Sequence, residues 1–541
     1  MTRRDGRGRP MDAWRPRRIG DLPAEAAQRW GDREALVFGG RRWTHGEVAV
    51  EVDRVAKGLV GLGVEPGDKV GIWMTNRPEW LFLMYAISRV GAVIVPLNTR
   101  YRAEDVAYAV DWADVSTLVV NDRSGPVDYS AMVREALPHW PKLSRLVVLG
   151  EDRPEGALSW EDLLAAGSRV EDATVVARAA DVDPGAPAII IYTSGTTSAP
   201  KGAVHSHAVV RSVGERAQMH GVTVADVHAG YLPLFHAFGF TEVALMSTMT
   251  GSRQVLFEAF DANEVLDAAE AEGITMFHGF DTHWSDFIRA QQARPRQLRL
   301  RMGTLAAGMQ SSTPVAYKAN EVFCPTVSGW GMSEVWTALV VSHVTATPEQ
   351  RLEASGYPML DVELRVVDPA TGADLPPDTP GELLSRSYTT MLGYYNDPVA
   401  TAATIDTEGW LHSGDLARLR PDGHVVFMGR LKDMLKVGGE NVAPAEVEGR
   451  LRELDGVVDV AVVGYPDPRL GEVPVAYVLV EPGAGVDDEA LLEHLRGRVA
   501  SFKIPRHVRL VAELPMTPTG KVRKVELRAR VLEELGDPGH G

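Results

Sequence analysis

The chain has 541 residues, and because a single hydrophobic core stops growing at about 250–300 residues, we expect at least two domains. Its composition, 45% hydrophobic and 24% charged, is typical of soluble globular proteins, and its formal net charge of −17 excludes a globally basic surface for nucleic acid. Cys324 is the single cysteine, which excludes an intramolecular disulfide and a thiolate zinc site and favours a reducing, cytoplasmic setting.

The first eighteen residues are rich in arginine, but no apolar run follows that could form the core of a signal peptide. We interpret residues 1–18 as a basic flexible tail, with weak peripheral attraction to a membrane surface as the alternative. The apolar stretch 81–97 contains Arg89 and Pro96 and is shorter than the roughly 20 residues that span a bilayer. It predicts a buried helix that leads into a buried strand, and no transmembrane segment.

Helical stretches and short β-rich runs alternate through the first part of the chain. Residues 44–62 have a helical pattern, whereas residues 69–74 and 92–96 are β-rich. The alternation continues with a buried strand at 188–192 and a helix at 262–272, which the strand-like segment ITMFHGF follows. Such alternation predicts an α/β domain with a largely parallel sheet.

The pattern changes near Gly356 to short β runs separated by turn signals, which indicates a small β subdomain at the end of the large domain. It changes again after Arg430, where we expect a compact α+β domain of usual size. Its predicted elements are a helix at 444–454, strands at 457–463 and 473–480, and a helix at 487–499.

We therefore divide the chain into a tail, a large N-terminal domain and a smaller C-terminal domain. The N-terminal domain covers 19–430 and combines α/β sheets with the small β subdomain, and the C-terminal α+β domain covers 431–541. The boundary lies in the segment GRLKDMLK. The overall fold class is α/β.

The segment YTSGTTSAPKG at 192–202 directly follows a buried strand. Its small residues let the backbone approach an anion while hydroxyls and amides point inward, as in phosphate-binding loops. A P-loop is the rival interpretation, but its pattern fails because Pro200 precedes Lys201 and Gly202 follows it. Taken alone, the segment is more often an ordinary surface turn.

Further short segments follow in a fixed order, and each would be weak evidence by itself. A lone histidine or tryptophan usually belongs to the core, and a lone SGD is a common surface turn. The segments are LPLFHAFG at 232–239, AAG at 306–308, GWGMSE at 329–334, SGD at 413–415, GRLKD at 429–433, VGGEN at 437–441 and PMTPTGK at 515–521.

In this order the segments resemble the signature motifs of the adenylate-forming superfamily, which includes acyl-CoA synthetases, luciferases and peptide-synthetase adenylation domains. The resemblance extends over roughly 22–535, almost the whole chain. Ser198 stands where that family commonly has glycine, and Trp330 and Ser333 replace the more usual tyrosine and threonine. The resemblance also implies that the C-terminal domain is mobile.

The resemblance implies a nucleotide site. The aromatic Trp330 is expected to stack on adenine, Ser333 to lie by the α-phosphate, and Asp415 to accept hydrogen bonds from the ribose hydroxyls. Glu334 is expected to bind Mg²⁺. The implied ATP- and AMP-binding residues are Thr193, Ser194, Gly195, Thr196, Thr197, Lys201, Gly308, Trp330, Gly331, Met332, Ser333, Asp415 and Arg430.

The resemblance also assigns the chemical steps. Lys521, Glu334 and His236 are the implied catalytic residues. The hinge and the CoA step are assigned to Lys432, Gly438 and Gly439, and the acyl pocket to Phe238, Phe240, Phe280 and Ala307. The segment HGFDTHW, around Asp281, departs from the commoner family pattern, so substrate specificity does not transfer from relatives.

The implied reaction joins a carboxylic acid to CoA. A carboxylate is a poor electrophile, and conversion to a mixed anhydride with AMP, with loss of pyrophosphate, activates it before CoA forms the thioester. ATP and CoA are co-substrates and Mg²⁺ is the cofactor. An apolar pocket would suit a fatty, alicyclic or aromatic acid. The sequence does not distinguish a monomer from a homodimer.

Three alternatives stay open at the level of sequence. The acyl group could pass to a free-standing carrier protein instead of CoA, or the chain could be a non-catalytic nucleotide-binding relative. The histidines His205, His207, His220, His228 and His236 could suggest a transition metal. Such zinc sites need defined ligand spacing and a supporting carboxylate, and the first two occupy a position usual for the family after the phosphate loop.

Overall fold

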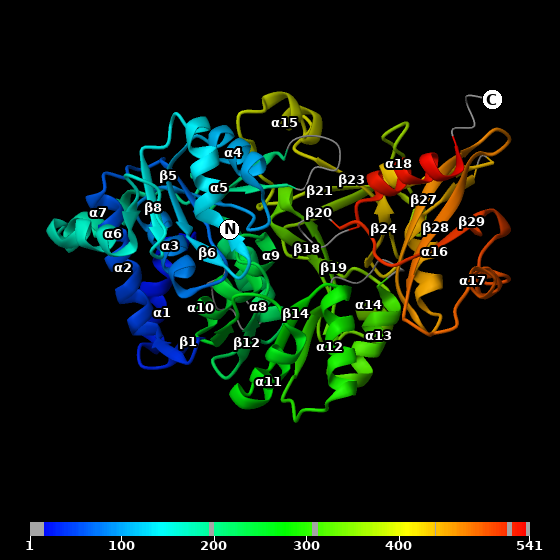
Figure 1. Cartoon of the computed structure of the whole chain (residues 1–541), viewed down its shortest axis with the longest axis horizontal. Coiled ribbons are helices and arrows are strands. Elements are labelled where there is room, and N and C mark those ends of the chain that lie inside the picture. Colours follow the sequence, from blue (N-terminus) through cyan, green and yellow to red (C-terminus); the bar gives the residue numbers. More distant parts are fainter. Residues whose placement is uncertain (1–15, 194–199, 306–311, 439, 517–521, 537–541) are drawn as a thin grey trace.

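The structure is a computed structural model of the chain, and it describes residues 16–193, 200–305, 312–438, 440–516 and 522–536. Two parts are visible in Figure 1: a large part built from several sheets with their helices, and a smaller C-terminal part at the right that contains β27–β29 and α16–α18. Within the described residues no helix is both long and apolar enough to span a bilayer.

An eight-stranded sheet forms one layer of the large part, with the strand order β22-β11-β10-β4-β3-β5-β8-β9. Neighbouring strands are parallel along the path β10-β4-β3-β5-β8-β9. The β10–β11 and β11–β22 pairs are antiparallel. The strand bounds are β3 Lys69–Trp73, β4 Val93–Pro96, β5 Val115–Asn121, β8 Arg145–Leu149, β9 Leu158–Ser159, β10 Pro187–Tyr192, β11 Gly202–Ser206 and β22 Gly393–Tyr394.

A seven-stranded sheet forms the second layer, in the order β16-β15-β14-β12-β13-β1-β2, and it is parallel except for the β1–β2 pair. Its strands are β1 Glu34–Phe38, β2 Arg41–Thr44, β12 Val227–Gly230, β13 Arg253–Leu256, β14 Met276–Gly279, β15 Met302–Leu305 and β16 Thr326–Val327. The carboxyl ends of parallel strands meet at one edge of a sheet, so β12, β14 and β15 all end at a common edge.

Helices pack on both sheets and between them. Those of the first part of the chain are α1 Leu22–Trp30, α2 His45–Gly61, α3 Pro78–Arg89, α4 Ala103–Trp112, α5 Tyr129–Ala136, α6 Trp160–Ala166 and α7 Asp172–Asp181. Those that follow are α8 Val209–Met219, α9 Ala237–Gly239, α10 Met246–Thr250, α11 Ala262–Glu272, α12 Asp281–Ala293, α13 Thr313–Val322, α14 Pro348–Leu352 and α15 Pro398–Thr404. The main core cluster includes residues of α2, α3 and α8.

Two antiparallel sheets complete the large part. The three-stranded one contains β17 Gly329–Met332, β18 Thr337–Val341 and β19 Tyr357–Pro358. The four-stranded one contains β20 Glu363–Val367, β21 Gly381–Arg386, β23 Leu411–Leu419 and β24 Val425–Arg430. A short ribbon pairs β6 Arg123–Ser124 with β7 Val127–Asp128. The small β subdomain predicted after Gly356 corresponds to the four-stranded sheet.

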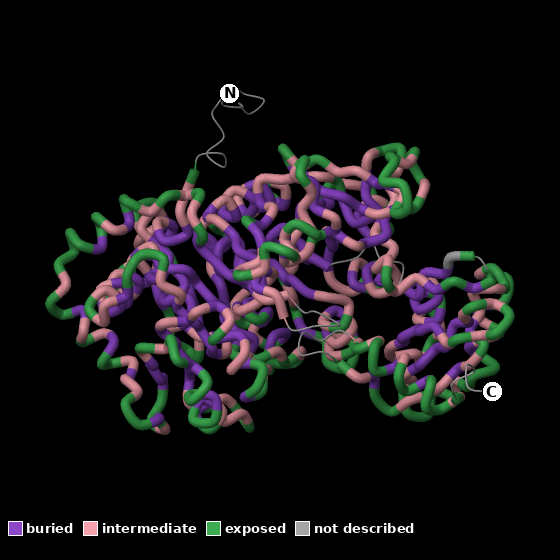
Figure 2. The backbone as a smooth tube through the Cα atoms, turned by 90° about the horizontal axis from the view of Figure 1, so that it is seen from above, coloured by how far each residue is buried: buried purple, intermediate pink, exposed green. Residues whose placement is uncertain are grey.

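The chain enters the C-terminal part through the 3₁₀ turn η7 Leu431–Asp433. A five-stranded sheet follows, in which β29 pairs with β28 beside the path β26-β25-β28-β27. Its elements are β25 Leu435–Val437, β26 Glu440–Val442, α16 Pro444–Arg452, β27 Val457–Asp467, β28 Gly471–Val480, α17 Asp488–Leu495, β29 His507–Val511 and α18 Lys524–Leu535. Figure 2 shows that this part has a buried interior of its own, with exposed residues around it.

The predicted mixed α/β architecture, with a large N-terminal domain and a smaller C-terminal one, is confirmed. The apolar stretch 81–97 divides as expected: α3 is almost entirely buried, and the buried strand β4 follows it. The numbered division at residue 430 stays a prediction, although β24 ends at Arg430 and the next sheet belongs to the C-terminal part.

Candidate active site

The phosphate-loop segment joins two antiparallel strands. Tyr192 pairs with Gly202 at the end of the β10–β11 hairpin, and the Thr193 amide donates to the Lys201 carbonyl at 2.8 Å. A Cβ on Gly202 would lie 2.7 Å from the Ile190 side chain, so this position needs glycine. Thr193 and Lys201 thus mark the base of the loop. The predicted loop residues Ser194, Gly195, Thr196 and Thr197 lie outside the described residues.

The segment that carries Ser333 and Glu334 is a strained turn between β17 and β18. Trp336 and Thr337 both have left-handed backbone angles, with φ of 59° and 68°, a conformation that costs of order 1–3 kcal/mol per non-glycine residue. The turn also explains Gly331, because an added Cβ there would lie 1.4 Å from the Thr337 carbonyl oxygen. Strain of this kind persists only where surrounding contacts fix the backbone.

Two buried side chains supply such contacts. His205 Nε2 donates to the Ser333 carbonyl at 2.7 Å, and burial lowers the pKa of His205 to about 4, which keeps the ring neutral. Arg216 donates to Thr337 Oγ1 at 2.6 Å and forms an ion pair of 3.2 Å with the buried Glu242. His205, one of the histidines that suggested a transition metal, therefore supports the turn.

Glu334 is 8% exposed and is held by residues of the segment around β22. The Tyr394 hydroxyl donates to Glu334 Oε1 at 2.7 Å, and the Met391 amide donates to the Glu334 carbonyl at 2.8 Å. The Nζ of Lys201 lies 5.1 Å from the centre of the Tyr394 ring. Burial, reinforced by the Glu334 carboxylate, raises the pKa of Tyr394 well above its usual value, so its hydroxyl stays a donor.

A second group joins Trp330, Asp415 and Arg430. Trp330 Nε1 donates to Asp415 Oδ2 at 2.8 Å, and Arg430 Nε lies 3.0 Å from Asp415 Oδ1. Asp415 and Arg430 face each other in the β23–β24 register. The Trp330 ring is 4% exposed and packs in a core cluster with the antiparallel strands. Its stacking on adenine stays a prediction.

His236 is the N-cap of the short helix α9 and accepts a hydrogen bond from the Phe238 amide through Nδ1 at 3.3 Å. The Phe280 ring lies 6.5 Å from the His236 ring and 5.4 Å from the Phe238 ring, centre to centre. Phe240 lies deeper, fully buried between two tryptophans of the core. The role of Phe240 in the acyl pocket stays a prediction, and the predicted Ala307 and Gly308 lie outside the described residues.

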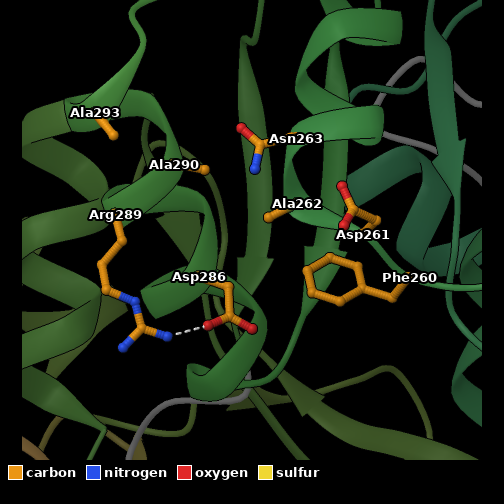
Figure 3. A pocket seen from close by; sticks show the side chains of 8 residues that line it. All are labelled: Phe260, Asp261, Ala262, Asn263, Asp286, Arg289, Ala290 and Ala293. Atoms are coloured by element: carbon orange, nitrogen blue, oxygen red, sulfur yellow. Dashed lines mark hydrogen bonds and ion pairs between the residues drawn. The ribbon is translucent and has the colours of Figure 1, made fainter.

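Aromatic contacts extend from this group to a surface groove. The His283 ring lies 6.0 Å from Phe280 and 4.7 Å from Phe260, centre to centre. Phe260 also lines a groove of about 450 Å³ between α11 and α12, where Asp286 and Arg289 form an ion pair (Figure 3). None of the sequence-predicted site residues lines this groove.

The predicted hinge residue Lys432 is exposed in η7, between two anchored neighbours. Upstream, Arg430 also donates to the Ser413 carbonyl at 3.2 Å, and downstream Asp433 forms an ion pair of 3.0 Å with Arg528 of α18. Gly438 has a left-handed φ of 60°, which favours glycine. Gly439 and Lys521 lie outside the described residues.

Glu334 is chemically suited to hold Mg²⁺. A carboxylate oxygen is a hard ligand, and Mg²⁺ usually takes one or two carboxylates together with waters and substrate phosphates. Tyr394 occupies one oxygen of Glu334, which leaves the other for a cation. Within the part of the chain that the structure describes, no group of three or more His, Cys, Asp or Glu side chains could hold a metal ion by itself.

The motif order alone did not identify Tyr394, His205, Arg216 or Glu242 as supports of the site. Tyr394 contacts a carboxylate 60 positions away in the sequence, and His205 contacts a carbonyl 128 positions away. A tyrosine just after a glycine and a histidine just after the phosphate loop were the visible signals. These two sequence signals indicate a supporting role only when the fold places β11, β22 and the 333–337 turn side by side.

Comparisons with known proteins identify the family of the chain. Residues 23–395 match the AMP-binding enzyme family, and residues 446–521 match the AMP-binding enzyme C-terminal domain. The putative acyl-CoA synthetase YngI of Bacillus subtilis is 32% identical over 540 residues, which cover 95% of this chain and 97% of that protein. A Mycobacterium tuberculosis CoA ligase named for a methyl-dioxo-octahydroindenyl propanoyl group is 35% identical over 501 residues, 92% of this chain and 96% of that one.

Among solved structures, that of the anthranilate CoA ligase AuaEII in complex with anthranoyl-AMP superposes with a TM-score of 0.88. Its sequence is 26% identical, and the match covers 97% of this chain and 100% of the other. The chain therefore belongs to the AMP-binding enzyme family, within the adenylate-forming superfamily. More narrowly, it is an acyl-CoA synthetase, an AMP-forming acid–thiol ligase.

Proposed function

We propose that this chain converts a carboxylic acid into an acyl-adenylate and then into its CoA thioester. The observation that carries the proposal is the closeness of two groups of side chains. The Trp330 indole donates to Asp415, and Trp330 lies four positions before Glu334 in the sequence. Tyr394 contacts both Glu334 and Lys201. The carboxylate that we propose to bind ribose and the residues that we propose to bind phosphate are thus joined through one short strand and turn.

The first step is an attack by the acid on the α-phosphorus of ATP, with pyrophosphate as the leaving group. Negative charge develops on the phosphate oxygens, so catalysis depends on positioning and on donors directed at that charge. Lys201 and Arg430 are described cations near the site, and Lys521 is the proposed bridge between the two substrates. Bound Mg²⁺ would neutralise phosphate charge at Glu334.

In the second step the CoA thiol attacks the acyl carbonyl, and AMP leaves with the bonding electron pair. This step needs a channel for pantetheine rather than a lysine above the anhydride. We assign the change between the two arrangements to rotation about Lys432. Its exposed position between two anchored neighbours supports that assignment.

The substrate that we propose is a fatty, alicyclic or aromatic acid. Phe238 and Phe280 place apolar rings beside His236, and a mostly apolar lining suits an apolar acyl group. Two similar ligases are named for ring-containing acids, one alicyclic and one aromatic, which supports the same class.

Acid-dependent exchange of pyrophosphate into ATP tests the proposal. We expect exchange with a subset of a panel that contains fatty, alicyclic and aromatic acids, and none without acid. Mass analysis after addition of either CoA or a carrier protein identifies the acceptor. Absence of exchange with every acid would favour a nucleotide-binding protein without catalysis, and acylation of the carrier alone would replace CoA as the acceptor.

A further inference from the structure

Tyr394 lies beside the base of the phosphate loop because of strand pairing. The short strand β22 pairs antiparallel with β11, so that Ala203 faces Tyr394. The hydrogen bond from the Tyr395 amide to the Gly202 carbonyl, 2.8 Å long, continues this pairing to the residue after Lys201. The position of the Tyr394 backbone is therefore fixed relative to the base of the loop.

The Tyr394 side chain reaches Glu334, which is expected to bind Mg²⁺, and Lys201, which is assigned to ATP. Its hydroxyl donates to Glu334 Oε1 at 2.7 Å, and its ring centre lies 5.1 Å from Lys201 Nζ. The backbone amide of Tyr394 donates to Thr401 Oγ1 at 2.8 Å, which ties the residue to α15. One side chain thus connects the carboxylate expected to hold the metal with the cation expected to bind phosphate.

The two contacts have different consequences. A carboxylate whose one oxygen accepts a fixed hydrogen bond has a restricted orientation, and its other oxygen then points in a defined direction. The aromatic face attracts the ammonium group of Lys201 and limits its rotamers without neutralising its charge. A glutamate without such a partner would lose rotational freedom of its side chain when the metal and the nucleotide bind. Because the Tyr394 contact has already restricted Glu334, this entropic cost of binding is smaller.

We propose that Tyr394 is a positioning residue that orients Glu334 for the metal and holds Lys201 beside it, so that Lys201 and the metal ligand are aligned before ATP binds. This inference rests on the proposed function, because it takes Glu334 as the metal ligand of an adenylating enzyme. Tyr394 itself contacts neither the metal nor the reacting atoms in this assignment.

The chain contains a closely matched control. The adjacent Tyr395 also donates its hydroxyl to a carboxylate, Asp114 Oδ2 at 2.8 Å, and also has a lysine over its ring, Lys69 at 5.5 Å. Neither partner belongs to the predicted site. Tyr395→Phe therefore removes the same chemical group from the same strand end without a contact to Glu334.

The test compares Tyr394→Phe with Tyr395→Phe in the full-length protein. We expect Tyr394→Phe to raise the Mg²⁺ concentration for half-maximal pyrophosphate exchange by about tenfold or more, since loss of a partner that orients a metal ligand typically lowers metal affinity 10- to 100-fold. Mn²⁺ binding in the presence of a non-hydrolysable ATP analogue, followed by electron paramagnetic resonance, should weaken in parallel. Tyr395→Phe should leave both quantities unchanged.

A double-mutant cycle separates positioning from general destabilisation. Once Glu334→Gln has removed the carboxylate, adding Tyr394→Phe should cause little further loss of Mn²⁺ binding. All measurements are made below the lowest unfolding temperature of the set. Equal Mg²⁺ dependence and Mn²⁺ binding in Tyr394→Phe and the wild type would overturn the inference. Absence of acid-dependent exchange in the wild type would instead overturn the proposed function.

Discussion

Individual side chains in this site are held in place by other side chains of the protein. Asp415 is 2% exposed, accepts from Trp330 and pairs with Arg430, and Glu334 is held in a similar way by Tyr394. Buried carboxylates are costly unless their oxygens have partners, so these contacts make the charged side chains tolerable in the folded state. They also fix the direction in which each carboxylate presents its remaining acceptor capacity.

The first prediction concerns Glu334. We expect Glu334→Gln to retain the fold but to require a much higher Mg²⁺ concentration for pyrophosphate exchange, because a neutral amide is a poorer ligand for a hard cation than a carboxylate. A titration of Mg²⁺ against the exchange rate measures the effect. Glu349→Gln, which alters an exposed surface ion pair, is the control. An unchanged titration for Glu334→Gln would place the metal elsewhere.

The charged residues proposed for the site could be named from the sequence, but their supporting residues could not. Glu334, Asp415 and Arg430 belong to segments whose order is specific, so they could be named without coordinates. Tyr394 and Arg216 could not, because their contacts join strands and turns that are distant in the chain. The backbone strain at Trp336 was also invisible, since nothing in its residue type predicts a left-handed φ.

At the scale of elements, local patterns set most boundaries and long-range pairing set the rest. The helix predicted at 44–62 is α2 His45–Gly61, whose N-terminus has a capping box formed by Thr44 and Glu47. The strand predicted at 457–463 continues as β27 to Asp467 because it pairs along its length with β28. The hydrophobic periodicity of a segment indicates which of its faces is buried, but it does not show how far the partner strand extends.

A buried ion pair, Arg216 with Glu242, contacts the turn between β17 and β18 through Thr337. Arg216 is 1% exposed, and burial raises the pKa of its partner Glu242 while Arg216 opposes that shift. We expect Arg216→Met to destabilise the protein by about 3–5 kcal/mol, because it leaves a buried carboxyl group without its cation. Urea unfolding followed by circular dichroism measures this change.

A double variant distinguishes the two roles of Arg216. Arg216→Met combined with Glu242→Met should recover most of the lost stability, since apolar side chains can replace a buried ion pair. It should not recover pyrophosphate exchange, because Thr337 and the strained turn still lack the Arg216 hydrogen bond. Full recovery of both would show that the turn does not depend on Arg216.

Neutral histidines in the seven-stranded sheet predict acid sensitivity. His228 on β12 and His278 on β14 share a hydrogen bond of 3.0 Å, and burial lowers the pKa of His228 to about 4 and that of His278 well below its usual value. The unfolded chain therefore binds more protons below about pH 6.5, and stability is lost as the pH falls from there towards the folded pKa.

Each such histidine contributes up to about 1.4 kcal/mol of stability per pH unit within this window. We expect urea midpoints to fall between about pH 6.5 and pH 5, and His228→Gln to make that fall shallower. The exposed His139→Gln is the control. Midpoints that stay constant over this range would show that these histidines do not control acid stability.

At the scale of the whole molecule, the two parts meet around a short connection (Figure 1). In the described orientation α16 contacts α13 and β24 of the large part. Arg452 of α16 lies close enough to Asp281 to interact with its charge. Burial lowers the pKa of Arg452, but the carboxylates of Asp459, Glu448 and Asp281 outweigh burial, so the net shift is upward. Asp281 belongs to the segment that departs from the family pattern, so its charge is a particular feature of this interface.

The connection itself is narrow. Arg430 is held to β23 through Asp415 and Ser413, whereas Asp433 is held to α18 through Arg528. Only Leu431 and Lys432 lie between these two anchors. A rotation of the small part that preserves both anchors must therefore change the backbone angles of these two residues.

Proline at Lys432 tests whether this rotation is needed. Lys432 lies in a 3₁₀ turn, where φ is usually −50 to −70°, and proline fixes φ near −65°, so the substitution is compatible with one orientation and opposes another. We expect Lys432→Pro to retain acid-dependent pyrophosphate exchange while losing most CoA-thioester formation. Lys432→Ala controls for the loss of the side chain, because it leaves the backbone free to rotate.

Lys521→Ala should show the opposite profile: it should lose adenylation while it still transfers the acyl group from preformed acyl-AMP to CoA, because the ammonium group is needed while charge develops at the α-phosphorus. The two variants are compared in both half-reactions, with exchange measured for the first and thioester mass for the second. If Lys432→Pro lost or retained both steps together, either Lys432 would not be the pivot or the reaction would proceed without reorientation of the small domain.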